Sequence, residues 1–242
     1  MVTVSIMQGC NGKNHSHSMV TVSIMQGCKH KLKKKDTTFR TAICPEERVL
    51  ITLRYYATGC TFKTLSYNFL RGHTSIRNVV VSTSLAIWNV LQPHFLPIQT
   101  AQQWKKIADR YYELWNLRHC LGSVDGKHIR IKAPPKSGSA FYNYRQYFSI
   151  VSLATADADG LFLTIDVGEY GRNSDGRVFR ESAFGKALIN KQIDLPGASH
   201  LPGEPDLAPF PYYFVGDEAF PLMENLMRPM RPYPRRQCRY YY

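Results

Sequence analysis

Two short stretches decide the fold class: Leu121-Gly-Ser-Val-Asp-Gly-Lys-His-Ile-Arg-Ile131 and Val215-Gly-Asp-Glu-Ala-Phe-Pro-Leu222. Each has the apolar character of a strand and carries an aspartate, Asp125 within the first and Asp217 at the end of the second. Carboxylates at buried or half-buried strand positions are costly unless a cation or hydrogen bonds compensate them. Because Mg²⁺ and Mn²⁺ prefer oxygen ligands, the pair indicates a metal site. Both acids also fit a simpler interpretation as turn residues beside glycine.

The segments around these stretches alternate between strand and helix patterns. Apolar runs with β-branched residues predict the strands, and Asp157-Ala-Asp-Gly160 has the chemistry of a hairpin turn. The expected elements are strands over 120–131, 147–156, 161–167 and 212–215, a helix over 174–188 and a Pro-rich connector over 196–211. Three strands, a helix and a fourth strand predict an α/β layer.

The preceding part of the chain has helical periodicity. Pro45 suits a first helical position and Gly59 a helix end; a short helix follows from Thr61, and a longer one from Thr74 is expected to stop at Pro93. This outline predicts a helix-turn-helix region. Thr100 and Gln103 form a capping box for a fourth helix, which we expect to be a spacer.

The two ends of the chain show no pattern of a fold. Residues 1–10 recur unchanged at 19–28, and Lys29-His-Lys-Leu-Lys-Lys-Lys35 is a basic run compatible with nuclear import, phosphate contact or a solvated tail. The expected organisation is a disordered basic leader over 1–40, a helical region over 41–117, an α/β domain over 118–230 and an irregular tail over 231–242.

The charge balance favours a polyanionic partner. Lys and Arg number 31 against 18 Asp and Glu, which gives a net charge of +13. Six scattered cysteines without a C-x-x-C pair indicate neither a disulfide scaffold nor a zinc ribbon, and favour a reducing compartment. No stretch reaches the roughly 18 apolar residues of a membrane span, so no membrane partner is expected.

Two groups of residues are candidates for DNA contact. The first surrounds the start of the third helix, where a recognition helix meets base edges. The second lies beside Asp125, where cations would guide a phosphate backbone or simply form an exposed strand face. The candidates are Arg71, Ser75, Arg77, Asn78, Lys127 and Arg130.

Several linked motifs resemble the Harbinger-type transposases and the transposase-derived nucleases of the DDE superfamily. Besides the two opening stretches, Ser139-Ala-Phe-Tyr-Asn-Tyr-Arg-Gln-Tyr-Phe-Ser-Ile-Val151 is similar to the aromatic entry into the family's second strand. The segment from Ile165 to Phe179 is similar to its third strand and following helix. The resemblance covers about residues 44–228, in the family's order.

The resemblance implies that residues 118–230 form an incomplete RNase H-like DDE nuclease domain with a mixed sheet, and that its acid triad binds two Mg²⁺ or Mn²⁺ ions. Asp125 would be the first acid and Asp217 the second, both as catalytic residues and metal ligands. The family's third acid, a glutamate on a later helix before Phe-Gly, has no matching motif before Tyr242, and Glu224 is too close to Asp217. Asp166 could support the site from a neighbouring strand, whereas Asp175 suits a helix N-terminus.

Two functions remain open at this point. The first is a metal-dependent nuclease acting on double-stranded DNA in the nucleus, with the cytoplasm as a second location and impaired by the missing acid. The second is a catalytically inactive relative that binds DNA or a partner; an accessory DNA-binding protein is a further expected partner. A two-carboxylate glycosidase explains neither the positive charge nor the helical front.

Overall fold

The computed structural model describes residues 27–36, 38, 41–204 and 206–229, and the chain divides into two compact units. The first unit ends at Pro97 and the second begins at Ile98. The first copy of the repeated decapeptide, most of the second copy, and the tail expected over 231–242 lie outside the described residues. Each unit is described here by itself.

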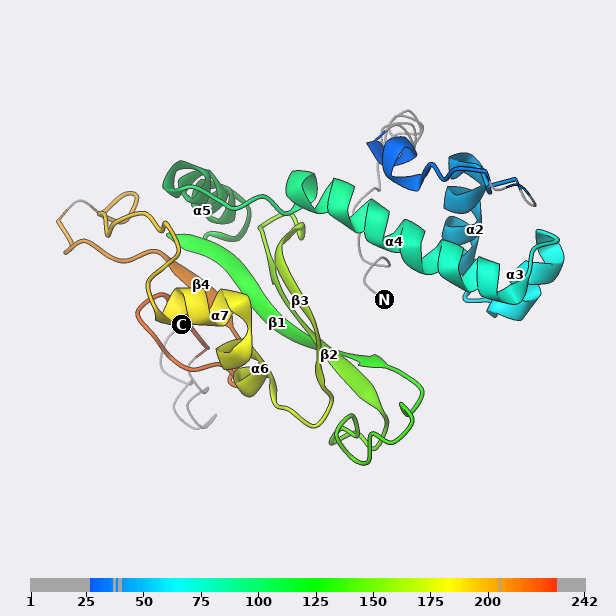
Figure 1. Ribbon diagram of the computed structural model, residues 1–242. Helices are drawn as coiled ribbons and strands as arrows, with labels where there is room; N and C mark the ends of the chain where they lie inside the picture. Colours follow the sequence, from blue (N-terminus) through cyan, green and yellow to red (C-terminus); the bar gives the residue numbers. More distant parts are fainter. Residues whose placement is uncertain (1–26, 37, 39–40, 205, 230–242) are drawn as a thin grey trace. The chain divides into compact units, whose positions relative to one another are not determined.

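The first unit is helical throughout its regular structure (Figure 1). It contains α2 (Pro45–Thr58), α3 (Phe62–Asn68) and α4 (His73–Phe95). Gly59 ends α2 in the left-handed conformation, and the Thr61 hydroxyl caps α3 by accepting from the backbone N–H of Thr64. The stripe expected on α4 is buried and packs against α2 and α3: Ile76, Val80, Thr83, Ile87 and Leu91.

Three expectations for this unit need correction. Residues 27–32, which we expected to have no fold, form a short helix whose Cys28 and Leu32 are buried in the core. The third helix begins at His73 rather than after Thr74, because the Gly72 carbonyl already accepts from the N–H of Ile76. Pro93 does not stop it. A proline in the last turn removes only its own N–H bond, so the helix continues to Phe95.

The second unit is built on a five-stranded mixed sheet in the order β3-β2-β1-β4-β5 (Figure 1). Its strands are β1 (Cys120–Arg130), β2 (Ser149–Ala156), β3 (Phe162–Tyr170), β4 (Tyr213–Gly216) and β5 (Leu226–Met227). β1 pairs antiparallel with β2, and β2 pairs antiparallel with β3, whereas β4 runs parallel to both β1 and β5. The α/β class and the mixed sheet expected from the sequence are confirmed, with β5 as an additional short strand.

Three helices cover this sheet. The capping box of Thr100 and Gln103 starts α5 (Ala101–Trp115), which packs on β1 and belongs to the second unit. The observed division of the chain therefore precedes the expected boundary at residue 117 by this helix. The helix expected over 174–188 is two helices, α6 (Asp175–Glu181) and α7 (Ala183–Ile189), separated by Ser182 in an extended conformation.

The core of the second unit lies between these helices and the sheet. Aromatic rings dominate it, with Phe179 and Phe214 fully buried and Trp104 packed edge-to-face on Phe214. Phe220, which follows β4, packs edge-to-face on Phe179 of α6. These contacts fix α6 relative to the end of β4, which is where the two motif strands meet.

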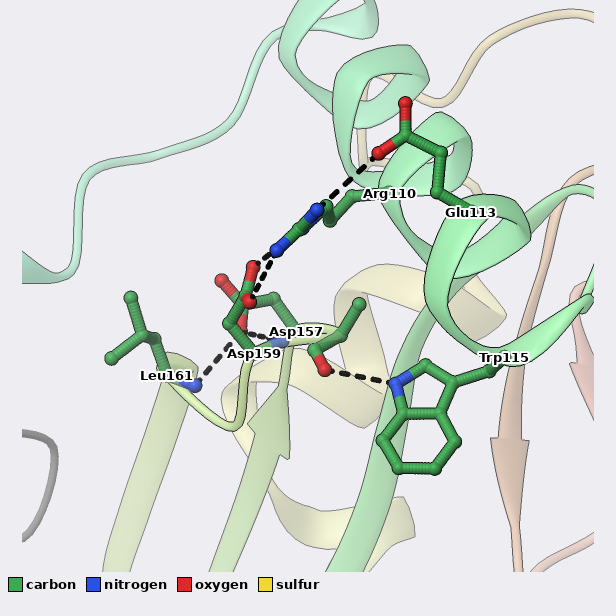
Figure 2. Close-up of polar contacts among 7 residues, drawn as sticks. Arg110, Glu113, Trp115, Asp157, Asp159 and Leu161 are labelled. Carbon is green, nitrogen blue, oxygen red and sulfur yellow. Dashed lines mark hydrogen bonds and ion pairs between the residues drawn. The ribbon is translucent and has the colours of Figure 1, made fainter.

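The β2–β3 hairpin is fastened to α5 (Figure 2). Arg110 forms two hydrogen bonds with the Asp159 carboxylate, and the Trp115 indole donates to the carbonyl of Ala158. Asp157 accepts from two N–H groups within its own turn, those of Asp159 and Leu161. The two aspartates are turn residues, as the sequence predicted.

Candidate active site

The two motif aspartates occupy equivalent places on neighbouring strands. The parallel register of β1 and β4 pairs Val124 with Gly216, so Asp125 is the next residue on β1 and Asp217 is the residue directly after β4. Neighbouring strands lie about 4.8 Å apart, which brings the two residues side by side although 92 positions separate them in the sequence. Both are exposed rather than buried, so their charge is tolerated without a bound cation.

Local hydrogen bonds hold each carboxylate. Asp125 Oδ1 accepts from the N–H of Gly126 at 2.8 Å, and Asp217 Oδ1 accepts from the N–H of Ala219 at 2.9 Å. The second bond closes the turn that follows β4, and Phe220 anchors that turn in the core. Each carboxylate is therefore oriented by its own loop, and neither uses an ion pair from elsewhere in the described part of the chain.

A third carboxylate, that of Asp175, reaches the same place from the first turn of α6. A Cβ atom on Gly126 would collide with the Asp175 carboxylate, and one on Gly176 would collide with the carbonyl of Ala219. The two glycines therefore allow α6 to pack directly against β1 and against the turn that holds Asp217. The sequence explained Asp175 by the helix dipole alone; its proximity to the other two acids was not predicted.

Asp175 differs from the other two acids in its surroundings. Its Oδ1 atom is buried without a hydrogen-bond partner. Burial raises the pKa of the Asp175 carboxyl; the neighbouring charges of Asp217 and Asp125 raise it further, while His128 opposes the change. An unpartnered, desolvated oxygen beside two carboxylates favours the approach of a cation or a proton donor.

His128 lies between this acidic group and the β2 strand. Its Nδ1 atom lies 3.0 Å from the Ser149 hydroxyl, which also accepts from the Asn143 side chain. Its ring packs edge-to-face on Tyr144. These contacts fit a supporting role for His128 rather than direct metal ligation.

Two other acids considered from the sequence, Asp166 and Glu224, bond to groups outside this site. Asp166 lies on β3, which β2 separates from β1, and its carboxylate accepts from the N–H of Ala183 at the start of α7. The sequence suggested that Asp166 supports the site from a neighbouring strand. In the structure, β2 lies between its strand and β1. Glu224 pairs with Lys191 at 3.3 Å.

The donor chemistry of this site suits a hard divalent cation. Asp125, Asp175 and Asp217 offer only oxygen atoms, and one of these is a buried oxygen without a partner. Over the residues that the structure describes, however, no three His, Cys, Asp or Glu side chains stand close enough together to enclose a metal ion.

The candidate DNA contacts divide between the two units. On β1, Lys127 and Arg130 are exposed, and the Arg130 guanidinium lies over the ring of Tyr147. On α4, Arg77 and Asn78 are exposed and Ser75 is partly exposed. Arg71 is different: its guanidinium forms two 3.0 Å bonds with Glu47, so it joins the start of α2 to the turn before α4.

A comparison with protein families indicates the class of protein that this chain is similar to. Residues 124–239 match the family model described as DDE superfamily endonuclease. That span begins one residue before Asp125 and includes Asp175 and Asp217. This part of the chain is thus similar to the DDE superfamily endonucleases, in agreement with the resemblance seen in the motifs.

Individual proteins of similar sequence give a more specific comparison. The chain is 26% identical over 172 residues to a rat protein named "Putative nuclease HARBI1", covering 67% of this chain and 46% of the rat protein. It is 25% identical over 210 residues to the mouse protein of the same name, covering 83% of this chain and 53% of that protein. It is 24% identical over 196 residues to the Arabidopsis thaliana "Protein ALP1-like", covering 78% and 45%.

These relatives connect the chain with the Harbinger-derived nucleases that its motifs resemble. The chain spans about half the length of the curated relatives it matches. No solved structure matches it significantly. Among the helices that the structure describes, none combines the length and apolarity that a bilayer span requires.

Proposed function

We propose that this protein is a metal-dependent nuclease of transposase origin that cleaves phosphodiester bonds in DNA. The observation that carries the proposal is the register of β1 with β4, which brings Asp125 and Asp217 together at adjacent strand positions. The family model and the names of the relatives support the same class. The mixed sheet, with parallel β4 beside antiparallel β1–β3, supports an RNase H-like fold.

In this proposal Asp125 and Asp217 hold a divalent ion, Mg²⁺ or Mn²⁺. Such an ion supplies activation of water and neutralisation of charge on the departing oxygen. Asp175 provides a third carboxylate from α6, where its packing against Gly126 brings it to the same place. His128 orients the group through its bond with Ser149. Lys127 and Arg130 lie on the same strand as Asp125 and attract the phosphate backbone.

We further propose that α4 is the DNA-reading element of a helix-turn-helix. Ser75, Arg77 and Asn78 lie in its first two turns and off its buried stripe. A nuclear location and an accessory DNA-binding protein belong to this proposal as well; the basic run Lys29–Lys35 and the net charge of +13 are consistent with both.

A plasmid-nicking assay in Mn²⁺ tests the nuclease directly. The purified protein should convert supercoiled plasmid to the nicked form, and Asp125→Asn and Asp217→Asn should each abolish the conversion. Asp109→Asn, an exposed aspartate on α5, is the matched control and should retain activity. Nicking that survives either of the first two substitutions would contradict the site.

The alternative function is DNA binding without cleavage. It is favoured by the finding that, among the described residues, no three His, Cys, Asp or Glu side chains lie close enough together to hold a metal ion. Under this alternative the protein binds duplex DNA in a gel-shift titration but leaves plasmid intact in Mn²⁺. The same two assays therefore separate the two functions.

A further inference from the structure

The helical unit contains a charge that its fold does not compensate. Arg48 of α2 is 6% exposed, yet among the described residues no carboxylate lies within ion-pair distance of its guanidinium. Its Nη2 atom donates to the Ser82 hydroxyl at 2.6 Å, whereas its Nε atom is buried without a partner. A buried cation of this kind costs stability unless an anion compensates it.

The few contacts of Arg48 hold it in place without neutralising it. Ser82 lies on α4, and its hydroxyl donates in turn to the carbonyl of Asn78 at 2.6 Å. The guanidinium is thus fixed between α2 and α4 by a neutral hydroxyl. Burial lowers the pKa of Arg48, and no nearby acid opposes that effect.

Arg48 lines a pocket of about 730 Å³ whose other polar walls are also cationic or neutral. The lining contains four basic side chains, and no carboxylate is part of it. The polar lining residues that bear on a ligand are Lys34, Lys35, Arg48, Arg77, Asn78 and Ser82. Lys34 and Lys35 are the last residues of the basic run in the sequence. Arg77 and Asn78 belong to the first turns of α4.

We propose that this pocket binds a phosphate group, with the Arg48 guanidinium as its fixed anchor. A guanidinium offers donors in a planar fork that matches phosphate oxygens, and the partnerless Nε is one of these donors. Lys34, Lys35 and Arg77 supply the surrounding positive charge, and Asn78 supplies an amide donor. The phosphate comes from the DNA backbone or from a free phosphate compound. Only the first source rests on the DNA contact proposed above for α4.

Thermal unfolding of the full chain in inorganic phosphate tests the pocket. Measurements in phosphate and in chloride at equal ionic strength separate specific binding from screening. Phosphate should raise the Tm of the wild type more than chloride does. Arg48→Met keeps the apolar stem and removes the charge, so it should lose the phosphate-specific increase. Arg54→Met, an exposed arginine on the same helix, should keep it.

Two substitutions of exposed residues test the same proposal if Arg48→Met does not fold. Lys34→Gln and Lys35→Gln change exposed side chains and should together weaken phosphate binding by roughly tenfold or more, as expected for lost charge-assisted bonds. Equal phosphate responses in the wild type and in either kind of variant would overturn the proposal, as would the lack of a specific response in the wild type.

Duplex binding then identifies the source of the phosphate. If the DNA backbone is the source, Arg48→Met should weaken binding of a duplex and reduce the salt dependence of its affinity by about one phosphate contact. If Arg48→Met loses the response to inorganic phosphate but binds duplex normally, the pocket takes a free phosphate compound. Neither result depends on plasmid nicking, so a failed nuclease and a failed pocket give different outcomes.

Discussion

The backbone of Gly126 lies directly against the Asp175 carboxylate, with no room for a Cβ atom between them. This contact joins the first motif strand to α6 and places a third acid beside Asp125 and Asp217. The family motifs do not state this relationship, since it arises from the way that α6 packs. It makes a glycine on β1 as important for the site as the acids themselves.

Gly126→Ala should therefore displace α6 and the Asp175 carboxylate. Overpacking of this kind costs about 1–3 kcal/mol, so the free energy of unfolding in a urea titration should fall by that amount. Gly197→Ala is the matched control, because a Cβ at residue 197 would meet no atom within 4 Å. Equal stability of the two variants would show that the approach of Asp175 to β1 is not as close as described.

Asp175→Asn should stabilise the protein in the absence of divalent ions. The substitution removes a negative charge that is partly buried, lacks a partner at Oδ1 and faces two other carboxylates. Such gains at functional sites are commonly accompanied by lost activity. We expect a higher Tm in EDTA and a smaller Mn²⁺-induced increase in Tm. Asp109→Asn should change neither quantity, and an unaltered Mn²⁺ response in Asp175→Asn would remove Asp175 from the proposed site.

The double substitution Arg77→Ala with Asn78→Ala should weaken duplex binding. Both side chains are exposed at the start of α4, and a base contact contributes about 1–3 kcal/mol, which corresponds to roughly tenfold or more in affinity. A gel-shift titration at fixed salt measures the change. Lys63→Ala, an exposed substitution on α3, should leave the affinity close to that of the wild type. Unchanged affinity in the double variant would assign DNA reading to another element.

The ion pair between Arg110 and Asp159 should make the stability of the protein depend on pH in the acidic range. The hydrogen bonds from Arg110 lower the pKa of Asp159 below its ordinary value of 3.8. A carboxyl with a lowered folded-state pKa contributes stability that is present above its unfolded pKa and is lost as the pH falls through its folded pKa. Asp159→Asn should therefore have a lower Tm than the wild type at pH 7, and the difference should shrink as the pH falls through the lowered pKa of Asp159.

A persistent difference in Tm at pH 2 would contradict this assignment. Arg110→Met removes the partner rather than the titrating group, and it should also lose stability at neutral pH, together with the pair that Arg110 forms with Glu113. Because the pair is exposed, both effects will be small and are best compared at low ionic strength.

Local signals account for what the sequence predicted well. Alternating apolar residues marked β1, and the capping box at Thr100 marked the start of α5. Asp125 and Asp217 were recognised because each lies in a short stretch of strand character that resembles one of the family's acidic motifs. These features depend on a few consecutive residues, so a single sequence contains them.

The remainder depends on packing between distant segments. The proximity of Asp175 to β1 requires two glycines, Gly126 and Gly176, that are 50 positions apart. The buried state of Arg48 depends on Ser82 of another helix, and nothing in the neighbourhood of Arg48 in the sequence marks it as a core residue. The short helix over residues 27–32 lies within what reads as a basic leader, and only its burial against α2 and α4 explains it.

The dual pairing of β1 has a consequence for hydrogen exchange. Residues 123 and 124 pair with both β2 and β4, whereas residues 126–130 pair with β2 alone. Amide protons in the doubly paired part should exchange with deuterium among the slowest in this unit, and those beyond Asp125 should exchange sooner. Asp125 thus lies at the boundary between a doubly paired part of β1 and a part that pairs on one side only. We expect the spacing of Asp125 and Asp217 to be fixed in the absence of a ligand, while residues 126–130 can still move.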